Sequence, residues 1–106
     1  MSFTITRKLE QLPSYPMLCK LAGQNHVHLT GDEHAGSFFC HGVEGNYEFG
    51  EGGLRGTFAG HGASGVFSFE AGQVAVTVNE KPFWLPEAFL NQKITDGLDA
   101  FCRELV

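Results

Sequence analysis

Apolar and polar residues alternate along the middle of the chain, with a regular interruption. Turn-type dipeptides recur every ten residues, at Gly31-Asp32, His41-Gly42, Glu51-Gly52, His61-Gly62 and Ala71-Gly72. Glycine takes a positive φ without steric cost, so such pairs suit the two-residue turns of β-hairpins. The runs between the turns have equal length, at 23–30, 33–40, 43–50, 53–60, 63–70 and 73–80. The pattern therefore predicts a six-stranded antiparallel β-meander.

Two-residue turns also predict which side chains share a face of the sheet, because residues paired across strands lie on the same face. Pairing about these turns places Phe38 opposite Gly45, Gly45 opposite Phe58 and Phe58 opposite Gly65. The predicted inner face is nearly all aromatic, aliphatic or glycine, and the outer face is mostly polar. Rings can lie over glycine backbone, and glycines let a sheet bend, so we expect a curved sheet. Inner-face residues that are candidates for ligand contact are His34, Phe38, Tyr47, Phe49, Phe58, Phe67 and Phe69.

A repeat of 20 residues underlies the meander, since GSFFCHGVEGNYEF (36–49) resembles GTFAGHGASGVFSF (56–69). A solenoid needs about three units to bury a core, and only two copies occur here. We interpret the repeat as a hairpin duplicated within one sheet.

The residues before the meander predict a short strand and a short helix. Residues 2–6 (SFTIT) alternate in the manner of a strand. Ser14 is a suitable N-cap, and Gly23 lies just past the expected end of a helix over 15–22. The apolar side of this helix consists of Met17, Leu18 and Leu21.

The residues after the meander predict a long helix. Pro82 and Pro86 end the strand pattern, and Pro86 opens a helix that runs to about Leu105. Its apolar residues recur at helical spacing, at Leu90, Ile94, Leu98, Phe101 and Leu105. Gly97 lies on this stripe, where we expect it to mark the closest approach to the sheet. The sequence thus predicts one α+β domain over residues 1–106, with the C-terminal helix across the concave apolar face in a helix-grip-like arrangement.

The ending VTVNEKPFWLPEAFLNQKITDGLDAF (Val76 to Phe101) is a strand, a proline-containing link and a helix. Together with the N-terminal strand–helix unit and the glycine/aromatic strands from Gly45 to Phe69, it resembles the small bacterial proteins of the polyhydroxyalkanoic acid system, which are associated with storage-polymer granules. The resemblance covers about two thirds of the chain, and the first helix is shorter than in that family. It implies contact with an apolar polymer surface, and it assigns no functional residue because it includes no catalytic or ligand motif.

Composition narrows the classes of function. A net charge of −5 and a pI near 5.4 argue against nucleic-acid binding, which normally requires a basic surface. No apolar run approaches the about 20 residues of a membrane span, and the N-terminus lacks the apolar core of a signal peptide, so we expect a cytoplasmic protein. Cys19, Cys40 and Cys102 form no CxxC pair, which predicts reduced, mostly buried thiols.

The histidines are the candidate metal ligands. His26 and His28 share the outer face of one predicted strand, a spacing that can bind a transition metal, but the neighbouring outer positions supply no third ligand. His41 and His61 occupy equivalent turns, where histidine tolerates a positive φ. His34 is predicted on the apolar face, either as a hydrogen-bonded core residue or as a polar anchor inside a pocket.

The sequence offers no convergent nucleophile and base, so we expect neither an enzyme nor a cofactor. The preferred function is a non-catalytic binding module, which holds an apolar small molecule or polymer surface between the inner face and the C-terminal helix. A second option is a structural or interaction domain with a filled core, which would engage a partner through Phe83–Leu85 or form a homodimer through an edge strand. A third is a metal-binding protein that uses its surface histidines.

Overall fold

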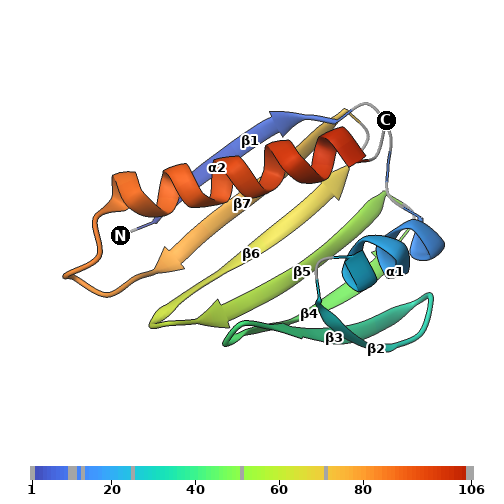
Figure 1. Cartoon of the computed structure of the whole chain (residues 1–106). Coiled ribbons are helices and arrows are strands. Elements are labelled where there is room, and N and C mark those ends of the chain that lie inside the picture. Colours follow the sequence, from blue (N-terminus) through green and yellow to red (C-terminus); the bar gives the residue numbers. More distant parts are fainter. Residues whose placement is uncertain are drawn as a thin grey trace.

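The computed structural model contains one antiparallel sheet and two helices (Figure 1). It describes residues 2–9, 12, 14–24, 26–50, 52–70 and 72–104. The elements are β1 (Phe3–Lys8), α1 (Tyr15–Gln24), β2 (His28–Gly31), β3 (Ala35–Cys40), β4 (Val43–Gly50), β5 (Gly53–Gly60), β6 (Ala63–Glu70), β7 (Gln73–Glu80) and α2 (Glu87–Glu104). Glu51, Ala71 and Leu105, which the sequence places in two turns and in the last helix, lie outside the described residues.

The strand order confirms the predicted meander. The seven strands are arranged β1-β7-β6-β5-β4-β3-β2, so consecutive strands from β2 to β7 lie side by side. β1 pairs antiparallel with β7, with Phe3 opposite Val78. The fold is therefore α+β, with an open sheet whose edges are β1 and β2 and with a long C-terminal helix.

The register from β3 to β7 also matches the prediction at the tested pairs. Gly45 lies opposite Phe38 and Phe58, and Gly65 lies opposite Phe58. His41 and His61 take φ values of 50° and 53° in their turns, and the glycine that follows each also has a positive φ. Two-residue turns of this kind fix the pairing, which is why the inner and outer faces could be read from the sequence.

Aromatic rings lie over the glycines of the inner face, as expected. A Cβ built on Gly45 would lie 2.5 Å from Cζ of Phe38, and one on Gly56 would lie 2.5 Å from Cζ of Phe67. Each would also lie 2.0 Å from a backbone oxygen of the neighbouring strand. Since real Cβ atoms do not approach other atoms so closely, these positions admit only glycine without a shift of the backbone.

The connection between β2 and β3 differs from the predicted two-residue turn. The carboxylate of Asp32 accepts the backbone N–H groups of His34 and Ala35 at 2.8 and 3.1 Å, and the N–H of Asp32 donates to the carbonyl of Ala35 at 3.0 Å. An aspartate that binds the backbone two residues ahead is a common turn-forming device. These hydrogen bonds to the carboxylate lower the pKa of Asp32, and the bond from the N–H of His34 has the largest effect. The result is a turn whose two central residues are Glu33 and His34, which lies two residues later in the chain than the predicted Gly31-Asp32 turn.

This loop moves the register of β2 and overturns the placement of His34. Leu29 lies opposite Phe38 instead of opposite His34, a shift of four residues along β3. Because four is an even number, Leu29 stays on the inner face. His34, however, leaves the strand, and its side chain is 81% exposed. The prediction that His34 lies on the apolar face is therefore wrong.

The end of α1 also differs from the prediction. The helix continues past Gly23, and the N–H of Val27 donates to the carbonyl of Ala22 at 2.8 Å. His26 takes a φ of 59°, so it occupies the left-handed position that commonly closes a helix and that glycine usually fills. His26 and His28 therefore do not share a strand, contrary to the sequence prediction, because β2 begins only at His28.

Both helices begin where the sequence predicted. The Oγ of Ser14 accepts the N–H of Met17 at 3.3 Å, which confirms Ser14 as the N-cap of α1. The carbonyl of Pro86 accepts the N–H groups of Phe89 and Leu90 at 3.2 and 3.3 Å, at the start of α2.

The two helices lie on the same face of the sheet, over opposite halves of it (Figure 1). The ring of Phe101 on α2 lies 5.1 Å from that of Phe69 on β6, and Nε of Arg7 on β1 lies 3.0 Å from a carboxylate oxygen of Asp99. The ring of Tyr15 on α1 lies 6.3 Å from that of Phe49 on β4. The sequence had suggested that the C-terminal helix alone covers the inner face. In the structure α1 and α2 share this face. The buried core cluster comprises Ile5, Leu9, Leu21, Tyr47, Leu54, Phe69, Val74, Val76 and Leu98.

Gly97 does not mark a close approach between α2 and the sheet. A Cβ built on Gly97 would meet nothing within 4 Å, and the residue is exposed. Because α2 lies towards the β1 edge, the space beside Gly97 stays open. The expectation of a close approach is therefore wrong.

Candidate apolar ligand pocket

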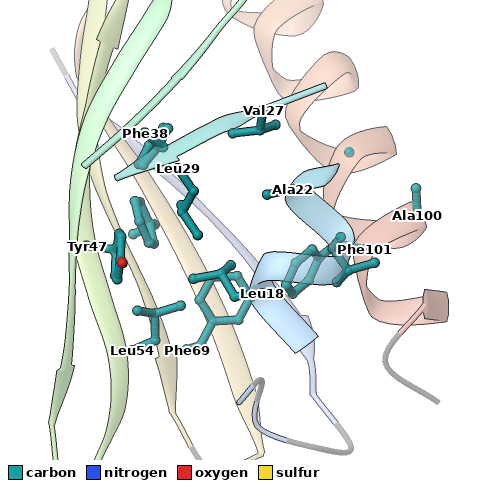
Figure 2. Close-up of a pocket in the computed structure, with 13 residues that line it drawn as sticks. Leu18, Ala22, Val27, Leu29, Phe38, Tyr47, Leu54, Phe69, Ala100 and Phe101 are labelled. Carbon is teal, nitrogen blue, oxygen red and sulfur yellow. The ribbon is translucent and has the colours of Figure 1, made fainter. Parts of the chain in front are cut away.

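A pocket of about 400 Å³ lies between the two helices and the sheet (Figure 2). This volume is at the lower end of the range for small-molecule sites, about 300–1,000 Å³. The lining comes from both helices and from five strands. It consists of Leu18, Leu21, Ala22, Val27, Leu29, Phe38, Tyr47, Leu54, Phe67, Phe69, Gly97, Ala100 and Phe101.

The placement of the helices explains why the pocket exists. α1 packs near β2 and β4, whereas α2 packs near β1 and β6, so the middle of the apolar face lies between them. The residues that border this gap on the helices include the small Ala22, Gly97 and Ala100. These small residues leave space that larger side chains would occupy.

The structure brings some of the predicted site residues together in this pocket. Phe38, Tyr47, Phe67 and Phe69 all line it. Their rings come from β3, β4 and β6, and Phe67 lies 6.1 Å from both Phe38 and Phe69. These contacts join Phe38, Phe67 and Phe69 into one aromatic wall, and Tyr47 lines the pocket as well.

Three predicted residues lie outside the pocket lining. Phe49 packs between Tyr15 and Tyr47, with ring distances of 6.3 and 5.9 Å. Phe58 lies over Gly65, and His34 lies in the exposed loop. The sequence pattern predicted that Phe49 and Phe58 lie on the inner face. It did not predict which part of that face would border the pocket.

Sequence reasoning missed the helical part of the lining. Leu18, Leu21 and Ala22 project from α1, and Gly97 and Ala100 belong to α2. The helical spacing of Leu18 and Leu21 was visible in the sequence as an apolar side. It carried no information on which half of the sheet α1 would cover.

The one ionisable side chain in the lining is Tyr47, and its hydroxyl is engaged. It donates a hydrogen bond to the carbonyl of Asp32 at 2.8 Å. Burial is the first cause that raises the pKa of Tyr47. The pKa of Tyr15 is also raised, to about 12. The main cause is a hydrogen bond with the thiol of Cys19, and the second is desolvation.

We expect both tyrosines to titrate above pH 10 in the native protein, and they are the only two in the chain. Because their folded-state pKa values exceed the usual value, the stability they contribute is complete below about pH 10 and is lost as the pH rises from there towards 12. The titration is measured from tyrosinate absorbance. The protein unfolded in urea serves as the reference, and Tyr15→Phe isolates Tyr47. A native tyrosine that ionises at or below pH 10 would contradict this prediction.

Over the ranges that the structure describes, no group of three or more His, Cys, Asp or Glu residues converges. The Nε2 of His61 donates to the carbonyl of His41 at 2.9 Å and so connects two neighbouring turns. Cys19 and Cys40 are both free thiols. Cys40 is half-buried, but Cys19 is exposed, so the prediction of buried thiols is wrong for Cys19. Cys19 lies on α1 one turn after Tyr15, which allows the hydrogen bond between them.

Comparison of the chain with models of protein families gives no match. Neither curated proteins nor solved structures match it. Neither helix, over the residues described, has the length and apolar character needed to cross a membrane.

Proposed function

We propose that the protein is a non-catalytic binding module that holds an apolar molecule in the pocket between α1, α2 and the sheet. The observation that supports this function most directly is the space of about 400 Å³ between the helices and the sheet, whose lining is almost entirely apolar. Rings already occupy the space over Gly45, Gly56 and Gly65, so these glycines do not create the pocket. Unfilled apolar space lowers the stability of a fold, so a domain with only a structural role would be more stable with larger side chains in this space.

The character of the lining indicates the class of occupant. Aromatic and aliphatic side chains form nearly all of it, and such walls gain free energy mainly by excluding water from an apolar surface. A small molecule or a segment of an apolar polymer chain would satisfy this wall. The polymer alternative agrees with the resemblance of the segment Val76–Phe101 to granule-associated proteins.

A second candidate function is contact with a partner through the link between β7 and α2. The N–H of Leu85 donates to the carbonyl of Pro82 at 3.1 Å, so the link forms a turn. This turn presents Phe83, which is 96% exposed, and Trp84, which is 66% exposed. Two adjacent exposed aromatic residues are typical of a contact surface, either for a protein or for an apolar polymer. Homodimer formation through β1 or β2 belongs to the same class of function.

The pocket proposal is tested by filling the space from the α1 side. We expect the uncharged fluorophore Nile red to bind the wild-type protein, and Leu18→Trp to weaken this binding about tenfold or more, because the indole occupies the pocket. Binding is measured as the rise in dye fluorescence with protein concentration.

Lys20→Trp is the matched control, since it introduces the same side chain at an exposed position on the same helix. Urea unfolding of both variants establishes that they are folded at the assay temperature. If Leu18→Trp binds the dye as tightly as Lys20→Trp does, the dye binds elsewhere and the pocket proposal is wrong.

A further inference from the structure

We propose that the pocket selects an uncharged molecule and rejects the same hydrocarbon chain when it carries a carboxylate. This inference rests on the proposed binding function and specifies the chemistry of its ligand. It depends on three features of the pocket: its side chains, its backbone and a lining without lysine or arginine.

The side chains that line the pocket offer a carboxylate no free donor. Among the described residues that line the pocket, only Tyr47 has a hydroxyl, amide or charged group. It is 3% exposed, and its proton is directed to the carbonyl of Asp32 at 2.8 Å. To bind an anion, this hydroxyl would have to break that bond and leave the carbonyl of Asp32 without its partner, which costs free energy.

The helical backbone around the pocket is also committed. The N–H of Leu18 donates to the carbonyl of Ser14 at 2.9 Å, and that of Val27 donates to Ala22 at 2.8 Å. Gly97 and Ala100 lie well inside α2, beyond its first turn, where N–H groups bond to the preceding turn. No helix N-terminus therefore opens into the pocket to bind an anion.

The cations of the protein lie outside the lining. None of the seven lysine and arginine residues borders the pocket. Arg7 pairs with Asp99 at 3.0 Å, and Nζ of Lys81 donates to the carbonyl of Leu85 at 2.8 Å. The net charge of −5 adds a general repulsion of anions. A carboxylate in this pocket would lose its hydration without gaining a partner, which is the costly case for a buried charge.

The test compares two molecules that differ in one end group. 1-Octanol and octanoate are titrated against the complex of Nile red with the protein at pH 8, and displacement is followed by fluorescence. We expect 1-octanol to displace the dye at a concentration about tenfold lower, or lower still, than octanoate does. We also expect 1-hexanol to be about fifteenfold weaker than 1-octanol, because each buried methylene contributes about a fourfold gain in affinity.

A variant with a cation in the pocket wall provides the positive control. Leu18→Lys should narrow or reverse the preference by improving the binding of octanoate relative to 1-octanol. Gln24→Lys adds the same charge at an exposed position of the same helix and should leave the preference unchanged.

The outcomes separate this inference from the function on which it rests. If octanoate binds the wild type as tightly as 1-octanol does, and Leu18→Trp abolishes both, the pocket binds ligands but the selection against charge is wrong. If neither molecule displaces the dye and Leu18→Trp has no effect, the binding function itself is wrong. A preference for 1-octanol that Leu18→Lys removes and Gln24→Lys retains supports both.

Discussion

Replacing Leu98 by alanine is expected to lower the free energy of unfolding by about 2–5 kcal/mol. Leu98 is 8% exposed. It belongs to the core cluster together with Ile5 on β1 and with Val74 and Val76 on β7. Truncation to alanine removes apolar contacts and leaves a cavity under α2. Since the total stability of a domain is about 5–15 kcal/mol, this loss would be large. It is measured by urea unfolding followed by circular dichroism.

Phe89→Ala is the control for this prediction, because it truncates another large apolar residue of the same helix. Phe89 is 51% exposed, so its loss should change stability by about 0.5 kcal/mol or less. Equal effects of the two substitutions would mean that α2 does not bury its Leu98 side against the sheet.

Replacing Gly56 by alanine is expected to lower the free energy of unfolding by about 1–3 kcal/mol or more. The added Cβ would lie 2.0 Å from the carbonyl oxygen of Asn46 and 2.5 Å from Cζ of Phe67. Rotation of the phenylalanine ring can relieve only the second contact, because the first involves the backbone of β4. The substitution should therefore strain the pairing of β4 with β5, and the loss is measured by thermal and urea unfolding.

Gly97→Ala is the matched control, since the added Cβ at this position meets nothing within 4 Å. Alanine is the better helix former by about 1 kcal/mol, so this variant should be more stable than the wild type. The double variant Gly56→Ala/Phe67→Leu should recover only part of the loss at Gly56. Full stability in Gly56→Ala alone would show that neither the backbone of Asn46 nor the ring of Phe67 lies so close to this glycine.

The turns explain why the pairing of β3 to β7 could be predicted from the sequence. A two-residue turn such as His41-Gly42 leaves no freedom in the pairing that follows, so one local signal fixes many distant contacts. The loop at Asp32 gave the same dipeptide signal, because Gly31 precedes it. There, the side-chain carboxylate of Asp32 accepts the backbone N–H of His34, and the turn forms two residues later in the chain. The identity of the dipeptide does not reveal whether a side-chain carboxylate or a backbone carbonyl will accept these backbone N–H groups.

The candidate site could be predicted only in part, for a related reason. Strand periodicity assigned Phe38, Tyr47, Phe67 and Phe69 to the inner face, where all four line the pocket. It could not place the helices, because an apolar stripe such as that of α2 fits equally well on either half of an apolar sheet. The gap between α1 and α2 is a property of how the helices divide the face, and tertiary packing alone decides it.

The pairing of β1 with β7 has a consequence for the order of folding. Strands β2 to β7 meet neighbours in sequence, so their contacts close short loops and form with little loss of chain entropy. β1 instead pairs with a strand far away in the sequence, as in the pair of Phe3 with Val78. This strand raises the contact order of the fold more than any other, and it adds to an edge that the hairpins can form without it. We therefore expect the meander to form first, and β1 to dock on it last and to detach from it first.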